Sequence, residues 1–199
     1  MLYLLLKQTQ ALMCINKWLL TSFLVHNPDE AGGNVGSKAT LGDLDGFKCG
    51  FKNPFSMVDG GSFDPDKAYK DSKLCNVMTC LELARRLKAQ RSLVTANVMN
   101  PGLIPTTGLF REFNPLFVAV FTFLTRYVFK VAASEEEGGA RLAFMISSPD
   151  LNSVSGTYYS GRPGQQEYVP IEPSNEAKDQ KKAKLLWTLT ESLIRNERL

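Results

Sequence analysis

The segment "KAYKDSKLCN", residues 67–76, places a tyrosine and a lysine four residues apart. In a helix, Tyr69 and Lys73 share one face, because positions i and i+4 lie one turn apart. A lysine ammonium close to a phenol stabilises the phenolate, so we expect it to lower the pKa of Tyr69 toward neutrality. A tyrosine in that state can donate or accept a proton while a carbon–oxygen or carbon–carbon double bond is reduced. The same spacing also arises by chance on solvated helices.

A second feature favours the chemical interpretation of this pair. The strand predicted after the helix, "SLVTANVMNPG", ends in Pro101 and Gly102. A Pro-Gly turn lets the backbone approach a ligand closely, and the hydroxyl of Thr106 can donate a hydrogen bond to it. In open α/β sheets, ligands bind in the crevice at the carboxyl ends of the strands. The sequence therefore predicts a binding site that begins at this turn.

The elements before the turn follow from apolar runs and capping residues. The apolar run over residues 17–25 predicts a strand buried on both faces. Residues 26–63 are rich in Gly, Asn and Asp and predict a long surface loop. Asp64 as N-cap and Pro65 at the first helical position open the long helix that carries Tyr69.

The elements after the turn continue the alternation of helices and strands. Ser134 and Glu137 form a capping-box pattern that opens another helix. Residues 153–161 predict a further strand, and a C-terminal helix is expected over residues 174–197 with Ser174 as its cap. Alternating strands and helices predict an α/β fold with a Rossmann-like parallel sheet and helices on both faces. We expect one domain over residues 1–199.

Composition limits the classes of function. Hydrophobic residues make up 44% of the chain and charged residues 22%, as in a globular protein. The net charge of +3 and the scattered basic residues argue against nucleic-acid binding. No CxxC pattern is present and His26 is the one histidine, so we expect no metal site. We expect the cysteines to be reduced thiols; they are Cys14, Cys49, Cys75 and Cys80.

The first residues are apolar but interrupted by polar side chains. Residues 1–25 lack the uninterrupted apolar stretch of a membrane helix and the basic start of a signal peptide. We expect a buried helix there, followed by the strand over residues 17–25.

The order strand, YxxxK helix, strand and PGxxxT resembles the second half of a short-chain dehydrogenase/reductase domain. The resemblance extends further, to the light-dependent NADPH:protochlorophyllide oxidoreductases of plastids. It runs from about residue 17 to the C-terminus and is carried by "GDLDGF", "MVDGG", "KAYKDSKLCN", "TTGLFRE" and "SEEEGGARLA". It implies NADPH as the hydride donor and protochlorophyllide as the substrate, whose ring D is reduced to give chlorophyllide in the light.

The resemblance also implies roles for individual residues. Tyr69 corresponds to the proton donor, and Lys73 to the residue that orients the cofactor ribose and tunes the tyrosine. Pro101, Gly102 and Thr106 correspond to the lining of the nicotinamide pocket.

The segment of residues 108–131 resembles a helical lid over the pigment. Leu103, Phe110 and Phe113 then correspond to substrate-binding positions. Its many aromatic side chains fit a planar tetrapyrrole or a peripheral contact with a membrane, and self-association is a further expectation. A buried amphipathic helix is the alternative for any single aromatic residue here.

Three departures from the family pattern bear on activity. The glycine-rich phosphate turn of the superfamily does not match any segment, since "GGNVG" at residues 32–36 precedes no predicted helix. We therefore expect an N-terminally incomplete domain. Phe23 stands where the family has a catalytic Ser or Thr, and adjacent strand residues such as Ser22 point to the opposite face. Leu103 replaces a cysteine thought to help position or protonate the pigment.

Two alternatives stay open at this point. One is a short-chain reductase that acts on another apolar substrate, such as a retinoid or a steroid-like lipid. The other is a non-catalytic protein that binds the pigment or a partner, favoured by the missing turn, Phe23 and Leu103.

Overall fold

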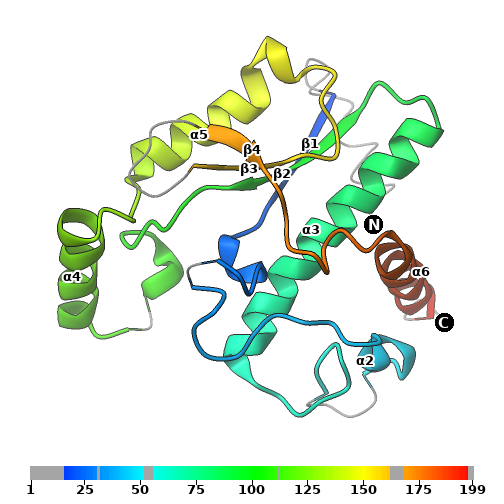
Figure 1. The fold of residues 1–199 in the computed structure, drawn as a ribbon, viewed down its shortest axis with the longest axis horizontal. Coiled ribbons are helices and arrows are strands. Elements are labelled where there is room, and N and C mark those ends of the chain that lie inside the picture. Colours follow the sequence, from blue (N-terminus) through cyan, green and yellow to red (C-terminus); the bar gives the residue numbers. More distant parts are fainter. Residues whose placement is uncertain (1–15, 31, 52–55, 112, 162–167, 197–199) are drawn as a thin grey trace.

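A four-stranded sheet forms the centre of the protein (Figure 1). The structure is a computed structural model, and it describes residues 16–30, 32–51, 56–111, 113–161 and 168–196. The helix expected before the first strand falls on residues 1–15, outside the described part. The strands lie in sequence order across the sheet: β1 (Lys17–Thr21), β2 (Thr95–Asn100), β3 (Tyr158–Gly161) and β4 (Tyr168–Ile171).

The predicted parallel sheet is confirmed for three of these strands. β1 pairs with β2 and β2 pairs with β3 in parallel. β4 is not among the predicted strands, and it pairs with β3 antiparallel. Only residues 162–167 separate the two strands, and a parallel return needs a crossover of a dozen residues or more.

The prediction of a first strand buried on both faces is wrong. β1 ends at Thr21, and its side chains are half-buried or exposed because it pairs with β2 alone among the described strands. The 3-10 turn η2 (Leu24–His26) takes up the rest of the apolar run. The apolar residues Phe23, Leu24 and Val25 are therefore partly buried next to and within this turn, and they do not belong to a strand.

Helices cover both faces of the sheet, as predicted (Figure 1). Helices α3 (Pro65–Ala89) and α6 (Gln180–Asn196) lie on one face, and α5 (Glu135–Ser147) lies on the other. The fully buried strand β2 alternates between the two layers. Val98 joins the core formed with α3 and α6, and Met99 joins the core around Met145 of α5.

The predicted N-terminal caps of two helices are confirmed. The carboxylate of Asp64 accepts the amides of Asp66 and Lys67, and Pro65 opens α3. Ser134 and Glu137 form the capping box of α5.

The predicted cap of the last helix is wrong. α6 begins at Gln180, and the carboxylate of Asp179 accepts the amide of Lys182 at 3.0 Å. Ser174 instead accepts the amide of Ala177 at 3.2 Å in a separate turn. Both positions carry good capping residues, and Ser174 caps the separate turn at 174–178, in which Ser174 and Ala177 are buried.

The long segment at residues 26–63 is not simply a surface loop. It contains the short helix α2 (Asp45–Lys48), and it buries Ala39, Leu41 and Leu44 completely or nearly so in the core shared by α3 and α6. The composition of this segment is typical of a solvent-exposed loop. Its few apolar residues are nevertheless enough to hold it against the core.

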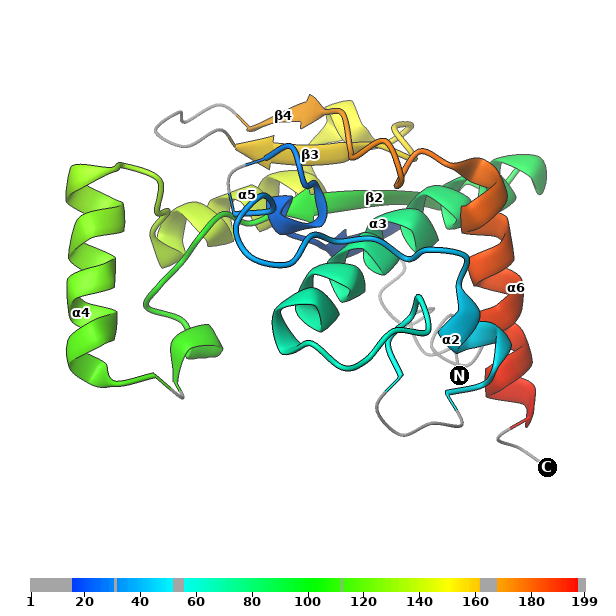
Figure 2. The same ribbon diagram turned by 60° about the horizontal axis from the view of Figure 1, so that its bottom comes forward.

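The segment at residues 108–131 projects from the rest of the protein (Figure 2). It consists of a 3-10 turn η3 (Gly108–Phe110), helix α4 (Pro115–Phe123) and a π-helical turn η4 (Leu124–Val128). No residue of α4 is buried, so the alternative of a buried amphipathic helix is wrong for this segment. Among the described helices, none combines the length and apolarity that crossing a membrane requires.

Candidate active site at the carboxyl edge of the sheet

Tyr69 and Lys73 lie together on one face of α3, as their spacing predicts. The Lys73 Nζ atom is 5.2 Å from the centroid of the Tyr69 ring. It is also 5.2 Å from the ring centroid of Phe23, and the two rings lie 6.3 Å apart at an angle of 39°. The ammonium therefore sits over two aromatic rings, an arrangement that stabilises the cation through the ring quadrupoles.

The expectation that Lys73 lowers the pKa of Tyr69 is wrong. Burial raises the pKa of the Tyr69 phenol above its usual value. The ammonium of Lys73 contacts the ring face, and a cation at that position does not bond to a phenolate oxygen. Tyr69 therefore carries its proton at neutral pH, which is the state that a proton donor needs.

Ser22 fixes this part of α3 against the ends of two strands. Its hydroxyl donates to the Lys73 carbonyl at 3.0 Å, and its amide donates to the Met99 carbonyl at 2.9 Å. Asn76 Nδ2 adds a bond of 3.2 Å to the Thr21 carbonyl. The Tyr69–Lys73 pair therefore lies at the carboxyl edge of the parallel strands, where α/β proteins place ligands.

The structure separates the roles of Ser22 and Phe23. Ser22 is completely buried, and its hydroxyl is committed to a backbone carbonyl of α3. The Phe23 ring packs beside Tyr69 and Lys73, where the family pattern predicts a hydroxyl. The Ser22 bond could not be predicted from local sequence patterns, because its partner lies 51 residues away.

The Pro-Gly turn follows β2 at the same edge. Gly102 adopts φ of +97°, a backbone conformation that favours glycine. Its amide donates to Asn100 Oδ1 at 3.1 Å, and Arg141 Nη1 on α5 donates to the Pro101 carbonyl at 2.7 Å. Arg141 is not among the predicted site residues, although it stands within the "SEEEGGARLA" segment.

Leu103 and Thr106 lead away from the turn. The Leu103 carbonyl accepts the Ala133 amide at 2.8 Å, and Leu103 forms a parallel bridge with Ala132. The two ends of the segment at 108–131 are therefore held together next to the Pro-Gly turn. Thr106 is exposed beyond this bridge.

Phe110 and Phe113 belong to a separate aromatic cluster. Phe110 lies 5.8 Å from Phe113 and 5.4 Å from Phe121, measured between ring centroids. Figures 1 and 2 both place α4 away from α3. Among the ring contacts of the described residues, Tyr69 is paired with Phe23, not with Phe110 or Phe113. The predicted substrate-binding residues thus fall into two groups, one at the turn and one in the projecting segment.

An open cleft of about 610 Å³ lies at the opposite edge of the sheet. It is lined by residues at the start of β1 and the end of α5, among them Lys17 and Ser147. The amino ends of parallel strands are not where such folds bind ligands, so we do not assign the chemistry to this cleft.

The described residues fit one end of a nicotinamide cofactor. Gly102 has no side chain, and a Cβ at this position would lie only 2.5 Å from Arg141 Nη1. The backbone of the turn is therefore open to a ligand. Lys73 provides a cation at the same edge of the sheet. For the phosphates, dinucleotide-binding folds use a glycine-rich turn that opens a helix. Within the described residues, β1 leads into η2, and the glycines at 32–36 lie in turns with no helix directly after them.

Comparisons with known proteins agree with the sequence resemblance. The chain is 42% identical over 178 residues to protochlorophyllide reductase B of Oryza sativa, and 41% identical over 178 residues to protochlorophyllide reductase of Pisum sativum. Both names include the word chloroplastic. The chain is a homologue of the protochlorophyllide reductases. Each match covers 88% of this chain and 44% of the relative, so the chain spans less than half the length of these relatives.

Two further comparisons concern the family and the fold. A scan against models of protein families gives no match. A crystal structure of an uncharacterised protein from Mycobacterium paratuberculosis superimposes with a TM-score of 0.56 at 21% identity. That match covers 90% of this chain and 50% of the other, and it supports the α/β fold alone.

Proposed function

We propose that this homologue of the protochlorophyllide reductases takes part in chlorophyll biosynthesis in the plastid, as a light-dependent reductase that converts protochlorophyllide to chlorophyllide with NADPH. The observation that carries the proposal is identity of 39–42% to chloroplastic protochlorophyllide reductases over 88% of the chain. A match of that extent spans the helix of Tyr69 and Lys73 and the Pro101–Gly102 turn.

Tyr69 is the proton donor in this proposal. Its phenol stays protonated because burial raises its pKa, and it lies at the edge of the sheet where a ligand would bind. NADPH supplies the hydride when it is bound. Proton transfer from Tyr69 completes the addition of hydrogen across the double bond, and the aromatic packing of Phe23 keeps water from one side of the phenol.

Lys73, Pro101, Gly102 and Thr106 form the cofactor side of the proposed site. The Lys73 ammonium can donate to a ribose hydroxyl, since it has no carboxylate partner among the described residues. Gly102 allows the nicotinamide to approach the backbone, and Thr106 offers an exposed hydroxyl next to the turn.

The segment at 108–131 forms the pigment side of the proposed site. Leu103 holds its base, and Phe110 and Phe113 belong to the aromatic surface that a planar pigment would cover. The same exposed surface is our candidate for peripheral membrane contact and for self-association, and both would compete with the pigment for it.

Illumination of the chain with protochlorophyllide and NADPH tests the proposal, with formation of chlorophyllide followed by absorbance. A parallel arm uses a fusion that adds the amino-terminal half of the Pisum sativum relative. Light-dependent chlorophyllide formation in either arm supports the proposal. Pigment binding without turnover in both arms would favour the non-catalytic alternative. The Phe23 ring beside Tyr69, at a position where the family has a hydroxyl, supports that alternative.

Leu103 distinguishes the pigment from another apolar substrate. A leucine leaves a polar group of the pigment unpaired, at a cost of about 1–3 kcal/mol. Leu103→Cys should therefore raise photoconversion of protochlorophyllide by about 5- to 150-fold at about 1.4 kcal/mol per decade. Robust retinoid reduction by the Leu103 form, with no pigment turnover by either form, would establish the lipid reductase instead.

A further inference from the structure

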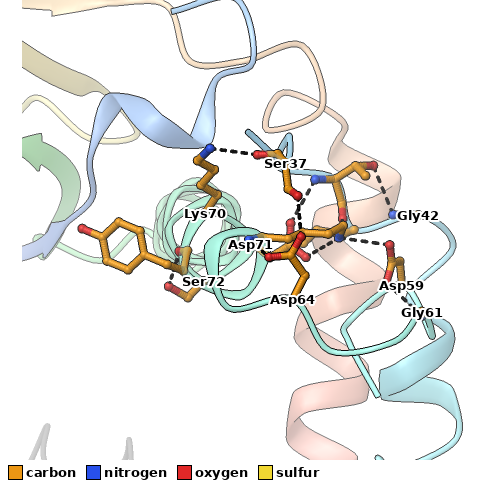
Figure 3. Close-up of polar contacts among 12 residues, drawn as sticks. Ser37, Gly42, Asp59, Gly61, Asp64, Lys70, Asp71 and Ser72 are labelled. Atoms are coloured by element: carbon orange, nitrogen blue, oxygen red, sulfur yellow. Dashed lines mark hydrogen bonds and ion pairs between the residues drawn. The ribbon is translucent and has the colours of Figure 1, made fainter. Parts of the chain in front are cut away.

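Helix α3 carries a second group of charged side chains, on a different face from the Tyr69–Lys73 pair. Lys67, Lys70 and Asp71 recur at the spacing of one helix face. Lys67 and Asp71 lie about half a turn around the axis from Tyr69, and Lys70 lies about a quarter turn from it. Figure 3 shows Lys70 and Asp71 reaching toward the preceding loop and the turn at Asp59. Nothing in the proposed chemistry uses these residues, although they stand next to Tyr69 in the chain.

Lys70 is buried yet fully hydrogen-bonded. Only 3% of the residue is exposed. Its ammonium donates to the Val35 carbonyl, to the Ser37 carbonyl at 2.8 Å and to Asp66 Oδ2 at 2.9 Å. A lysine has three N–H donors, so all of them are used, and a buried charge is tolerated only when it is satisfied in this way.

Asp71 makes the matching contacts with the next part of the loop. It is 1% exposed, its Oδ1 accepts the Thr40 amide at 3.0 Å, and its Oδ2 pairs with Lys67 Nζ at 2.5 Å. Lys67 in turn donates to the Thr40 carbonyl at 2.8 Å and pairs with Asp59 at 3.0 Å. The loop at 35–42 and the turn at Asp59 are thus joined to the first turns of α3 by charged groups.

Hydrogen bonds to buried charges constrain the rotation of a helix more strictly than apolar contacts do. An apolar side chain such as Leu74 can slide over its neighbours, whereas a small rotation of α3 would leave the Lys70 ammonium or the Asp71 carboxylate without its partners. Tyr69 directly precedes these two residues, so the same rotation would move its ring away from Phe23.

We propose that Lys70 and Asp71 are positioning residues, which set the rotation of α3 and thereby hold Tyr69 and Lys73 at the carboxyl edge of the sheet. The proposal rests on the function proposed above for that pair. Lys70 and Asp71 thus have a role different from proton donation by Tyr69, because their side chains bond to the loop at 35–42 and not to a ligand at the edge of the sheet.

Glu82 provides a matched control on the same helix. It is also a buried acid, 6% exposed, and it pairs with Arg85 at 3.0 Å and Arg86 at 2.7 Å. Its contacts lie within α3, about three and a half turns beyond Tyr69. A variant at Glu82 removes a buried ion pair from the helix without touching the loop at 35–42, so it reports what a purely stabilising role would do.

The first test compares the free chain with its Asp71→Asn, Lys70→Met and Glu82→Gln variants by NMR. Asp71→Asn places an amide donor against the Lys67 ammonium, and Lys70→Met keeps the unbranched apolar stem of the side chain but removes its donors. In both we expect the Ser37 and Thr40 amides to exchange at least about 10-fold faster with solvent. We also expect the nuclear Overhauser contact between the Phe23 and Tyr69 rings to weaken, whereas Glu82→Gln should leave both observations unchanged.

The second test measures photoconversion of bound protochlorophyllide with saturating NADPH. Asp71→Asn and Lys70→Met should lower the rate about 10-fold at an unchanged KM for the pigment, because the proton donor is displaced while the binding surface is retained. Glu82→Gln should convert the pigment at the rate of the parent.

The proposal is overturned if the Phe23–Tyr69 ring contact is as strong in Asp71→Asn as in Glu82→Gln. If Asp71→Asn does not fold, the same comparison is made with Lys70→Met. The proposal is also overturned if the ring contact weakens while photoconversion is unchanged. If the parent chain itself shows no photoconversion, the proposed function is what fails, and the NMR comparison alone decides whether these residues position Tyr69.

Discussion

Helices α3 and α4 begin in the same way, yet only one of them is fixed in place. Asp64 precedes Pro65 in the first, and Asn114 precedes Pro115 in the second. Each capping side chain accepts the amide two residues further along, at 2.9 Å in α3 and at 2.8 Å in α4. The local signals that start the two helices are therefore equivalent.

The two helices differ in what surrounds them. α3 buries Leu74, Val77 and Met78 completely and adds the buried charges of Lys70 and Asp71. α4 buries none of its residues, and Leu116, Val120 and Phe123 are more than half exposed. Capping decides where a helix starts, whereas packing decides whether it holds one position, because most helical stability in proteins comes from tertiary contacts.

This difference matches the tasks that we propose for the two helices. A proton donor must be held to within a fraction of an ångström, and α3 supplies that rigidity. A surface that receives a large apolar ligand must instead leave apolar area uncovered until the ligand arrives, and α4 does so. Substitutions in the two helices should therefore have different effects on stability and on binding.

Truncation of one leucine in each helix should give the largest contrast. Leu74→Ala removes a fully buried side chain and should lower the free energy of unfolding by about 2–5 kcal/mol. Leu116→Ala removes a side chain that is 73% exposed and should change it by no more than about 0.5 kcal/mol. Urea denaturation measures both, and equal losses would show that α4 is packed as firmly as α3.

Glycine substitutions should give a smaller contrast between the base and the interior of the projecting segment. Gly102→Ala meets a positive φ and a Cβ position 2.5 Å from Arg141 Nη1, so we expect a loss of about 1–3 kcal/mol. Gly108→Ala has no atom within 4 Å of the added Cβ and should be nearly neutral. Thermal unfolding of the two variants checks this order, and a neutral Gly102→Ala would contradict the geometry of the turn.

His26 should make the part of the protein around α3 sensitive to pH. Burial lowers the pKa of His26, and the hydrogen bond from its Nδ1 to the Phe23 carbonyl offsets this only in part. The unfolded chain therefore binds a proton more readily than the folded one, so stability should fall as pH drops through about 6.5 toward the lower folded value. The slope should not exceed about 1.4 kcal/mol per pH unit.

A His26→Gln variant is the control for that prediction. Urea denaturation between pH 7.5 and pH 5.5 should show a decline in the parent that is absent from the variant. A decline of the same size in both would assign the pH dependence to other groups.

An aromatic substitution on α4 should affect binding rather than stability. Phe123 is 58% exposed, so Phe123→Ser should leave the free energy of unfolding within about 0.5 kcal/mol of the parent. Its affinity for protochlorophyllide, measured by fluorescence titration, should fall by about 3- to 30-fold, since the ring no longer offers apolar area to the pigment. Unchanged affinity would remove α4 from the pigment side of the site.

Much of the architecture could be read from the sequence because its signals are local. Asp64 and Pro65 gave the start of α3, Ser134 and Glu137 gave that of α5, and the spacing of Tyr69 and Lys73 gave their common face. Each of these depends on residues within one or two helical turns.

The rest depends on contacts between distant segments. Ser22 bonds to Lys73 across 51 residues, and Arg141 bonds to the Pro101 carbonyl across 40. The shift in the pKa of Tyr69 was predicted with the wrong sign, because the spacing brings Lys73 to the ring but says nothing of where on the ring the ammonium lies or how deeply the phenol is buried. β4 was missed because its short run of residues carries no clear alternation.

The central claim is that Tyr69 donates a proton during reduction of protochlorophyllide. The most direct measurement is a single-turnover photoconversion assay that compares the chain with its Tyr69→Phe variant, alone and in the fusion with the amino-terminal half of the Pisum sativum relative. Phenylalanine keeps the ring against Phe23 and Lys73 and removes only the acidic hydroxyl. We expect pigment affinity to stay within about 2-fold and the yield of chlorophyllide per flash to fall by at least about 100-fold. Chlorophyllide formation by Tyr69→Phe at the parent's rate would contradict the account.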